Sequence, residues 1–419
     1  MCDMEGWKEK KIGEVADFSK GKLTEQCEGV NPNWMPLLNA DAINSESKFY
    51  ANPKGAVVCD ENDILMLWDG ERSGLVAIGK AGVVGSTFSK ITLKNELDSR
   101  FCFYYLQNQF AWIQNRRTGT GVPHVSKDLP SILSISFPTL LSEQQKIATI
   151  LSTIDQTIDQ TEQLIAKYKN IKQGLMHDLL TYGIDENGTI RNPQTHTFVE
   201  KKGLVVPEEW EVEQLDEIAN VSGGKRLPAG HEYSFVNFGF KYLRVTDFYN
   251  KKIDYFSLEN LEERTFLELE NYEIFPNDLF ISIAGSIGYV GVNKPNIEDR
   301  IILTENALRI NVSEVVLPDF LTLQINSEVV QKQIWSEVGT GGGVPKLAKH
   351  RVESLLIPFP KSNGNYNEQD KIISIIEQQD KIIESEQTNL TKLQKLKQGL
   401  MADLLTGKVR VKIDIPTKN

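Results

Sequence analysis

The sequence predicts an α+β protein, in which two similar mixed α/β domains are joined by two long antiparallel coiled-coil helices with pseudo-twofold symmetry. Three observations predict this fold. The chain of 419 residues is too long for one ordinary hydrophobic core. The segment KQGLMHDLLT at 172–181 returns as KQGLMADLLT at 397–406, with one position changed. Each copy ends a long heptad pattern that follows a stretch of mixed strand and helix character.

The repeat extends far beyond this short segment. The helical stretch EQQKIATILSTIDQ, which begins at Glu143, aligns without gaps with EQDKIISIIEQQDK, which begins at Glu368. The loops TGTGVPHVSKD (118–128) and TGGGVPKLAKH (340–350) also correspond. A repeat of this length indicates tandem duplication of a whole domain, because solenoid proteins repeat every 20–50 residues.

Periodicity and composition divide the chain into six consecutive segments. They are a first globular domain (1–141), a spacer helix (142–182), a connector (183–206), a second globular domain (207–366), a second spacer helix (367–406) and a C-terminal tail (407–419). In each globular domain, β-branched runs punctuated by glycine precede an amphipathic helical stretch. Regular βαβ alternation is missing, so both domains are expected to be α+β.

The two spacer helices carry an apolar seam with steps of three and four residues, which is typical of a coiled coil. Each helix spans ~38 residues, or ~57 Å at 1.5 Å per residue. A helix of this length with one apolar stripe needs a partner, and the other copy is the obvious one. The predicted helix-pairing seam consists of Ile147, Leu151, Ile154, Ile158, Thr161, Ile165, Tyr168, Leu175, Leu179, Ile372, Ile376, Gln379, Ile383, Glu386, Leu390, Leu393, Leu400 and Leu404.

The helices are expected to run antiparallel, because a turn-rich connector and a whole domain separate them in the sequence. One globular domain would then lie at each end of a paired-helix ruler. Thr161 and Glu386 occupy seam positions near the helix midpoints and are predicted to face each other. A polar pair inside a seam costs stability but specifies the register.

The composition excludes several classes of protein. Hydrophobic residues make up 40% of the chain and charged residues 25%, as in soluble globular proteins. No apolar run reaches the ~18–20 residues that cross a bilayer, and the N-terminus lacks the apolar core of a signal peptide. Cys2, Cys27, Cys59 and Cys102 lie far apart without CxxC spacing, which argues against a zinc site or a disulfide framework. We therefore expect a cytoplasmic protein with no membrane partner.

No catalytic or metal-binding motif stands out. GLVAIGKA (74–81) has the spacing of a phosphate-binding loop, but Ala81 stands where Mg²⁺ binding needs a hydroxyl. NPNW (31–34) lacks the second proline of the methyltransferase motif that it resembles, so a turn is favoured. The five histidines show no HExxH or other ligand spacing. The sequence therefore predicts no catalytic residue, no metal site and no cofactor bound by this chain.

Basic and hydroxyl side chains in matching loops of the two domains are the remaining functional candidates. The net charge of −11 means that any DNA site must be a local patch. Arginine can donate two hydrogen bonds to guanine and lysine can hold phosphate. A single exposed cation usually only solvates the surface, but these recur at matching places. The DNA-binding candidates are Lys20, Lys22, Arg72, Arg116, Arg117, Thr118, Thr120, His124, Lys127, Lys225, Arg226, Arg244, Thr340, Lys346, Lys349, His350 and Arg351.

With these features together, the whole chain resembles the specificity subunit of type I restriction–modification systems. The resemblance covers nearly all residues, and its combination of motifs is specific although no single motif is. The residues that carry it are Trp7, Trp210, Pro123, Pro345, the FP–EQ–KI junctions (Phe137 to Ile147 and Phe359 to Ile372), both KQGLMxDLLT ends and the connector at 182–210.

This resemblance implies a division of labour among subunits. Each globular domain would be a target recognition domain that reads one half of a split double-stranded DNA site, mainly through the major groove. The helices would set the gap between the halves and dock partners. Two modification (methyltransferase) subunits would supply S-adenosylmethionine and methylate an adenine that has left the base stack. Motor–nuclease (restriction) subunits would supply ATP hydrolysis with Mg²⁺ and DNA cleavage.

The charge of the second domain departs from that of a DNA-binding surface. Residues 207–366 carry 24 acidic and 15 basic side chains, and many of the acidic ones lie at 257–273. Carboxylates repel phosphate, so we interpret this stretch as a protein-docking or outward-facing surface.

Other interpretations stay open at this level. An orphan specificity subunit would serve a methyltransferase only, and the genes of its partners would distinguish it. A structural adaptor, with a coiled coil joining two protein-binding domains, would show no sequence-selective DNA binding in the presence of the methyltransferase. A fused enzyme is contradicted by the missing motifs.

Overall fold

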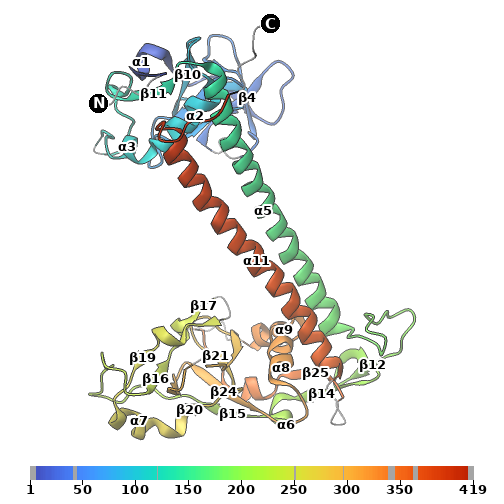
Figure 1. Cartoon of the computed structure of the whole chain (residues 1–419). Helices are drawn as coiled ribbons and strands as arrows, with labels where there is room; N and C mark the ends of the chain where they lie inside the picture. The colour runs from blue at the N-terminus through green and yellow to red at the C-terminus, as the bar shows by residue number, and fades with distance from the viewer. Residues whose placement is uncertain are drawn as a thin grey trace. The chain divides into compact units, whose positions relative to one another are not determined.

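The computed structural model describes residues 6–40, 45–119, 121–249, 252–295, 297–337, 345–361 and 367–413 (Figure 1). The chain divides into two compact units. Unit 1 comprises residues 1–164 and 386–419, and unit 2 comprises residues 165–385. The long helices α5 (Leu141–Thr181) and α11 (Asn367–Leu404) each contribute one part to each unit.

In its described residues, unit 1 combines three β-sheets with short helices. Its strands are β1 (Trp7–Lys11), β2 (Ala16–Lys20), β3 (Gln26–Glu28), β4 (Met35–Leu38), β5 (Phe49–Ala51), β6 (Val58–Cys59), β7 (Ile64–Leu67), β8 (Val76–Ala77), β9 (Gly82–Val84), β10 (Phe88–Leu93) and β11 (Ser134–Pro138). Its short helices are α1 (Ile12–Val15), α2 (Ser99–Asn108), α3 (Phe110–Gln114) and α4 (Leu129–Ile132).

The sheets of unit 1 place one fully apolar strand at the centre. β1 pairs with β11, and an antiparallel sheet has the order β2–β10–β7–β8. A mixed sheet has the order β3–β5–β4–β9–β6, in which β4 and β9 are parallel. All four side chains of β7, ILML, are buried, since the strand lies inside its sheet and is covered on both faces.

Unit 2 is built from the same kinds of elements. Its strands are β12 (Phe198–Lys201), β13 (Leu204–Pro207), β14 (Trp210–Gln214), β15 (Ala219–Gly223), β16 (Phe240–Leu243), β17 (Phe248–Tyr249), β18 (Lys252–Ile253), β19 (Glu259–Asn260), β20 (Glu273–Ile274), β21 (Leu279–Ser282), β22 (Val290–Val292), β23 (Arg300–Leu303), β24 (Ala307–Val312) and β25 (Leu356–Pro360). Its helices are α6 (Leu215–Ile218), η2 (Val245–Asp247), η3 (Tyr255–Ser257), α7 (Glu263–Leu269), η4 (Glu270–Tyr272), α8 (Pro318–Ile325), α9 (Glu328–Glu337) and α10 (Lys349–Glu353).

The sheet topology shows the duplication directly. The order β15–β24–β21–β22 matches β2–β10–β7–β8, and the pair β14–β25 matches β1–β11. The order β19–β16–β23–β20 matches β5–β4–β9–β6, including one parallel pair in each sheet. Register is kept as well, because Trp7 lies opposite Pro138 and Trp210 opposite Pro360. The prediction of two similar α+β domains is confirmed.

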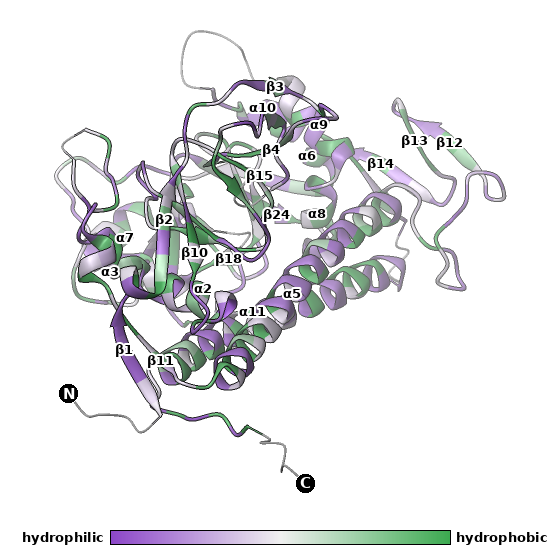
Figure 2. Cartoon of the chain, turned by 90° about the horizontal axis from the view of Figure 1, so that it is seen from above, coloured by the Kyte–Doolittle hydropathy of each residue, from purple (hydrophilic) through white to green (hydrophobic). Residues whose placement is uncertain are grey.

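Each unit has its own hydrophobic core, and both long helices enter each core. In unit 1, α5 contributes Ile147 and Leu151 and α11 contributes Leu404. In unit 2, α11 contributes Ile372 and α5 contributes Leu179. Figure 2 shows polar and apolar residues alternating along both helices. The apolar stripe is therefore shared between the partner helix and the adjoining domain.

The two helices pair antiparallel in each unit. In unit 1, Asp155 near the start of α5 forms an ion pair of 2.7 Å with Lys397 near the end of α11. In unit 2, Lys172 near the end of α5 forms an ion pair of 2.5 Å with Asp380 in the first half of α11. As the residue number increases along α5, the residue number of its partner on α11 decreases. The predicted antiparallel pairing is therefore confirmed.

Every predicted seam side chain is buried or half-buried. The buried ones are Ile147, Leu151, Ile154, Thr161, Ile165, Leu179, Ile372, Ile376, Gln379, Ile383 and Leu404. The half-buried ones are Ile158, Tyr168, Leu175, Glu386, Leu390, Leu393 and Leu400. Thr161 satisfies its hydroxyl within its own helix, by donating to the Thr157 carbonyl at 2.8 Å. That Thr161 faces Glu386 stays a prediction.

α2 ties the first domain to both helices of unit 1. The Tyr104 hydroxyl donates to Asp155 on α5 at 2.9 Å. Burial, together with the Asp155 charge, raises the pKa of Tyr104, so the phenol stays protonated and keeps donating. Lys397 on α11 lies 5.9 Å from the centre of the Tyr104 ring. One aromatic side chain therefore contacts both long helices.

A buried glutamine anchors the start of each long helix to its domain. Gln144 Oε1 accepts the Asp98 N–H at 2.7 Å, and its amide donates to the carbonyl that ends β11 at 2.8 Å. Gln369 Oε1 accepts the Leu317 N–H at 2.8 Å, and its amide donates to the carbonyl that ends β25 at 3.2 Å. Both glutamines are fully buried, where an amide needs such partners. The equivalent bonds fix both helix starts alike.

The preceding glutamate forms a second anchor, which we call the helix clasp. In unit 1, Glu143 binds Arg410, from just beyond the end of α11, with contacts of 2.6 and 2.8 Å. In unit 2, Glu368 binds Arg191, from beyond the end of α5, with contacts of 2.6 and 3.1 Å. Glu368 also accepts the Trp210 indole N–H at 3.0 Å. Each clasp joins the start of one helix to the chain that follows the other, which favours antiparallel pairing.

We expect Gly183→Ala to destabilise unit 2 because Gly183 lies against the helix clasp. Its φ of +66° already disfavours any residue with a Cβ atom. The added Cβ would also overlap the Glu368 carboxylate, the Arg191 guanidinium and the Trp210 ring. The urea midpoint of the full chain should therefore fall.

Gly188→Ala is the matched control for this experiment. Gly188 has a φ of +80°, but a Cβ atom there would meet no atom within 4 Å. Gly188→Ala should lower the free energy of unfolding by only about 1–2 kcal/mol, the cost of a left-handed backbone for a residue with a Cβ atom. Gly183→Ala should cost about 1–3 kcal/mol more, from overpacking. Equal urea midpoints for the two variants would show that the clasp does not depend on close packing at Gly183.

Candidate nucleic-acid interface

In unit 1, four segments that are distant in sequence meet at one end of the β2–β10–β7–β8 sheet. β7 leads into Trp68, whose N–H donates to the Thr87 carbonyl at 2.8 Å, just before β10. The Val125 N–H donates to the Trp68 carbonyl at 2.8 Å, which brings the Gly-rich loop to this end. The loop after β2 joins through Lys20. We call this surface rim 1; it comprises residues 19–22, 68–72, 85–87 and the described part of 116–128.

Asp69 lies at the centre of rim 1. One carboxylate oxygen lies 2.8 Å from His124 Nδ1, and the other lies 2.8 Å from Lys20 Nζ. The Asp69 side chain is 17% exposed, whereas those of His124 and Lys20 are 44% and 48% exposed. Asp69 therefore positions two predicted DNA-binding side chains while both remain accessible. Asp69 is not among the residues predicted from the sequence.

The two neighbouring arginines of rim 1 have different roles. The Arg116 guanidinium lies over the Trp112 ring, 4.0 Å from its centre, and the residue is exposed. Arg117 donates from Nη1 to the Glu71 carbonyl at 2.6 Å and from Nε to the Gln114 carbonyl at 2.9 Å. Arg117 therefore holds the loop in place, and Arg116 presents a stacked charge at the surface.

The other candidates of unit 1 lie on the surface of the same region. Thr118 and His124 exchange two backbone hydrogen bonds, of 3.0 and 2.8 Å, that close the Gly-rich loop. Thr120 lies outside the described residues. The exposed candidates are Lys22, Arg72, Thr118 and Lys127.

Unit 2 builds the equivalent surface from equivalent elements. β21 leads into Ile283, whose N–H donates to the Asn306 carbonyl at 2.8 Å, just before β24. The Leu347 N–H donates to the Ile283 carbonyl at 2.9 Å, and Ala284 forms a β-bridge with Lys346. We call this surface rim 2; it comprises residues 223–226, 283–286, 304–306 and 345–351.

The side chains of the two rims differ at equivalent positions. Ala284 of rim 2 stands where rim 1 has Asp69, since each bridges the residue after the Val–Pro of the Gly-rich loop. Lys346 is exposed beside the Ala284 methyl group, which cannot accept a hydrogen bond. In rim 2 the carboxylate comes instead from Glu305, which accepts from Arg226 Nε at 3.0 Å. The rims share a backbone frame and differ in chemistry.

Glu305 is held ionised beneath a largely exposed arginine. Burial alone would raise the pKa of Glu305, but hydrogen bonds from Thr304 and Arg226 bring this pKa below its ordinary value. The Arg226 side chain is 79% exposed. The Tyr242 hydroxyl donates to the Lys225 carbonyl at 2.7 Å, which fixes the backbone beside Arg226. Glu305 thus resembles Asp69 in positioning a predicted contact residue.

Several candidates of unit 2 have partners within the chain. Arg244 binds Asp247 at 2.9 Å and Glu259 at 2.8 Å, and hydrogen bonding to Asp247 raises its pKa further above the ordinary value. Lys349 lies 3.3 Å from Glu353, one helical turn later. Arg244 is thus occupied by two acids. Of the remaining candidates, Lys225 and His350 are exposed, Arg351 is half-buried and Thr340 lies outside the described residues.

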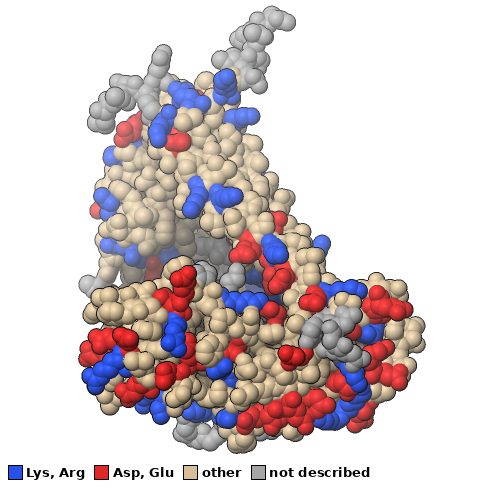
Figure 3. Space-filling view, turned by 60° about the horizontal axis from the view of Figure 1, so that its bottom comes forward, with Lys and Arg blue, Asp and Glu red and all other residues tan. Residues whose placement is uncertain are grey.

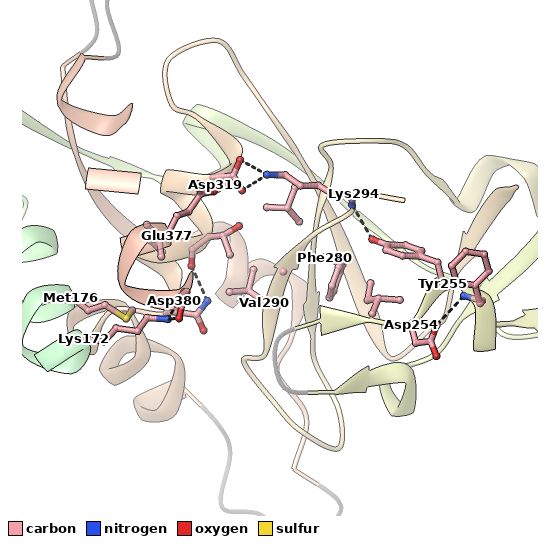
Figure 4. Close-up of a pocket in the computed structure, with 17 residues that line it drawn as sticks. Lys172, Met176, Asp254, Tyr255, Phe280, Val290, Lys294, Asp319, Glu377 and Asp380 are labelled. Atoms are coloured by element: carbon pink, nitrogen blue, oxygen red, sulfur yellow. Dashed lines mark hydrogen bonds and ion pairs between the residues drawn. The ribbon is translucent and has the colours of Figure 1, made fainter. Parts of the chain in front are cut away.

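A cavity of about 590 Å³ in unit 2 lies where α5 and α11 meet the β21–β22 hairpin (Figure 4). Its lysines are paired, Lys172 with Asp380 at 2.5 Å and Lys294 with Asp319 at 2.6 Å. The Tyr255 hydroxyl accepts the Lys294 backbone N–H at 2.9 Å. These pairs tie elements of unit 2 together and leave the lining lysines already neutralised.

The described part of the chain shows no group of three or more His, Cys, Asp or Glu side chains placed to hold a metal ion. Within those same residues, no helix is both long and apolar enough to cross a membrane. Cys27, Cys59 and Cys102 are free thiols, and burial raises the pKa of Cys59 to about 12. Cys2 lies outside the described residues.

Comparison with known proteins identifies the duplicated domain. The family described as "Type I restriction modification DNA specificity domain" matches this chain twice, over residues 4–170 and 207–395. The chain belongs to this family. Each family match contains one rim and the adjoining part of one long helix.

The relatives within this specificity family span almost the whole chain. The specificity subunit of type I restriction enzyme MjaVIII from Methanocaldococcus jannaschii is 29% identical and covers 97% of this chain and 94% of its own. The EcoBI specificity subunit from Escherichia coli is 20% identical and covers 97% of this chain and 86% of its own. Both relatives are named as specificity subunits of type I restriction enzymes.

Two solved structures share the fold. The S subunit of a type I restriction–modification system from M. genitalium has a TM-score of 0.56 at 18% identity, covering 97% of this chain and 96% of its own. A chain from a structure concerning complex assembly of the type I system has a TM-score of 0.61 at 15% identity, covering 97% and 99%. At these identities the likeness concerns the fold.

The charges of this specificity-family chain are mixed on the face that Figure 3 shows. Acidic side chains lie there among the basic ones. In rim 1, the Asp69 carboxylate is 17% exposed and is bound by Lys20 and His124. A DNA contact at the rims would therefore be local, as the net charge of −11 requires.

Proposed function

We propose that this chain is the DNA-recognition subunit of a type I restriction–modification complex. Each unit reads one half of a split double-stranded site with its rim, and the paired helices set the gap between the halves. The observation that carries this proposal is the duplicated rim, since the specificity domain occurs twice with the same frame of loops and exposed cations. Contacts with DNA phosphates position such a domain on the duplex, and contacts with base edges select the DNA sequence.

The two units are proposed to read different half-sites. Rim 1 presents Lys20 and His124 on one carboxylate, whereas rim 2 presents Arg226 on the Glu305 carboxylate and Lys346 beside Ala284. Donors at different positions select different base edges in the major groove. The target should therefore be asymmetric rather than palindromic.

The bond-making steps are proposed to belong to other polypeptides. Two modification subunits dock on this chain, hold S-adenosylmethionine and methylate adenine outside the base stack. Restriction subunits add ATP-driven, Mg²⁺-dependent cleavage, and the complex acts in the cytoplasm. This assembly fits the net charge of −11, because partner subunits can supply phosphate contacts that this chain lacks.

Methylome sequencing of cells that express this chain together with its modification subunit tests the proposed function. The expected result is a split motif that carries methylated adenine on both strands. Cells that express the modification subunit alone should lack the motif. A methylome without any split motif would contradict the proposal and favour the structural adaptor. Restriction of unmethylated DNA by the full complex would separate the proposal from an orphan specificity subunit.

Asp69→Ala is expected to alter one half of this motif and leave the other unchanged. The substitution gives rim 1 the residue that rim 2 has at Ala284, and it releases Lys20 and His124. Losing one positioned base contact typically costs about 1–3 kcal/mol of discrimination, or about 5- to 150-fold in methylation of the original site. The methylome of the variant complex gives the measurement.

Glu28→Ala is the matched control for Asp69→Ala, since it removes an exposed acid of the same unit outside rim 1. Its methylome should equal that of the wild type. Equal losses at both halves in Asp69→Ala would indicate a folding defect. An unchanged motif would show that Asp69 does not position contacts for recognition.

A further inference from the structure

Unit 2 exposes a cluster of apolar side chains that its own core does not use. Phe235 is fully exposed, and Val236 and Phe238 are 57% and 51% exposed. All three lie within four residues of one loop between β15 and β16. Scattered exposed hydrophobic residues are common, whereas a contiguous cluster marks a surface that binds something.

The loop that carries these side chains is held in a defined conformation. The Ser234 N–H donates to the Asn260 carbonyl at 2.8 Å, and the Asn260 side-chain amide donates back to the Ser234 carbonyl at 3.3 Å. The Thr265 hydroxyl lies 2.8 Å from His231 Nδ1. Phe235 itself contributes nothing to this network. The backbone that carries the apolar side chains is therefore preorganised, which lowers the entropic cost of binding.

A groove separates this loop from α7. Its volume is about 490 Å³, and its lining includes His231, Glu232, Phe235, Phe238, Glu262 and Arg264. Because the aromatic side chains stand on one wall, a protein segment with an apolar side chain could seat there. We call this the aromatic groove.

The charges around the aromatic groove are mainly negative. Glu232 and Glu262 line it and are exposed, and Arg264 adds one positive charge. On α7, Glu263 is exposed too, and Glu268 lies 3.3 Å from His231 Nε2. Except for Glu232, these acids belong to the acidic stretch 257–273. Such a surface repels DNA phosphates and attracts a basic partner.

We propose that the aromatic groove docks an apolar, lysine- or arginine-bearing segment of one modification subunit. This inference rests on the proposed function, in which this chain holds two such subunits. An apolar aromatic centre surrounded by charged side chains is typical of protein–protein interfaces. A contact on the recognition domain itself would orient a methyltransferase toward the half-site that unit 2 reads.

The groove also distinguishes the two modification subunits. The equivalent loop of unit 1, between β2 and β4, exposes the aliphatic side chains Leu23 and Val30 beside the cation Lys22. It lacks the aromatic cluster of unit 2. The contact therefore holds one modification subunit of the two more tightly, and the complex is asymmetric.

The test uses the full-length chain and the purified modification subunit, with binding measured by calorimetry and stoichiometry by native mass spectrometry. In the variant Phe235→Ser/Phe238→Ser, one of the two modification subunits should bind at least about 10-fold more weakly, as when an aromatic hot spot is truncated. Phe256→Ser is the matched control, because Phe256 is 73% exposed in the same unit but lines the other cavity. The control should bind both subunits as the wild type does.

A charge-reversal variant tests the electrostatic part of the proposal. Glu232→Lys/Glu262→Lys should weaken the same binding step at low salt and remove most of its salt dependence, because the attraction is between exposed charges. If binding of the modification subunit is unchanged in both the aromatic and the charge-reversal variants, the groove does not dock it. If assembly is unchanged but DNA affinity falls, the loop contacts DNA and the inference is overturned.

The failure of this inference is distinguishable from failure of the proposed function. A wild-type chain that assembles and directs methylation of a split motif, with groove variants that assemble equally well, overturns the groove alone. A wild-type chain that binds no modification subunit overturns both.

Discussion

Lengthening both long helices by one heptad is expected to lengthen the gap of the methylated motif by about three base pairs, with both half-sites unchanged. Seven residues add ~10.5 Å at 1.5 Å per residue, and DNA rises ~3.4 Å per base pair. A heptad keeps the seam in phase. The insertions belong between Ile158 and Ile165 in α5 and between Ile383 and Leu390 in α11. Methylome sequencing reads the gap directly.

Insertion of the heptad into α5 alone is the control for this experiment. The seam of α11 could not follow the longer helix, so methylation should be lost or strongly reduced. The double insertion should restore methylation with the new gap. If the double insertion methylates sites with the original gap, the helices do not determine the spacing.

Glu368→Ala is expected to destabilise unit 2 by up to about 3–5 kcal/mol, because the buried Arg191 guanidinium would keep only a longer ion pair of 3.6 Å with the exposed Glu209. The Arg191 side chain is 6% exposed and would lose its bidentate carboxylate. The Trp210 indole N–H, on a fully buried residue, would lose its acceptor as well. Urea unfolding of the full chain measures the effect as a lower transition midpoint.

Two further variants separate the clasp from general effects of charge. Lys408→Ala removes a 76%-exposed partner of Asp403 and should change stability by less than about 1 kcal/mol. Glu368→Leu/Arg191→Met removes both charges of the clasp and should recover part of the loss, since the only ion left without its partner is the exposed Glu209. A Glu368→Ala midpoint equal to that of Lys408→Ala would contradict a stabilising clasp.

The long helices could be predicted in detail because their signal is local. Steps of three and four between apolar residues determine both the helix and its buried stripe. The structure starts α5 at Leu141 and α11 at Asn367, next to the predicted starts at 142 and 367. The second copy of the pattern indicated the partner as well, because one apolar stripe needs another.

The partners in the two clasps could not be predicted. Glu143 and Glu368 stand at equivalent positions of the repeat, but their arginines come from segments that do not align. Arg191 follows α5 within a long connector, whereas Arg410 follows α11 within the short tail. Ion pairs depend on where the chain returns in space, and no periodic pattern encodes this return.

The rims could be predicted in part. The basic loops were visible as matching sequences, and the structure brings Lys20 and His124 together. Asp69 and Glu305, which position these two side chains and Arg226, were not visible as functional residues. The available signal was a polar residue directly after a buried strand, and this signal is common in loops.

The sequence by itself determined the duplication, the α+β character of both domains, the two long helices and their antiparallel pairing, because repeats and periodicity are written in neighbouring residues. Only the tertiary structure decided which basic side chains are accessible at the surface and which, like Arg244, are already bound by acidic side chains. It also decided that the acidic stretch borders a groove with exposed aromatic side chains. The physical reason is range: helix and strand patterns arise from residues a few positions apart, whereas hydrogen bonds, ion pairs and exposure depend on segments that meet only after folding.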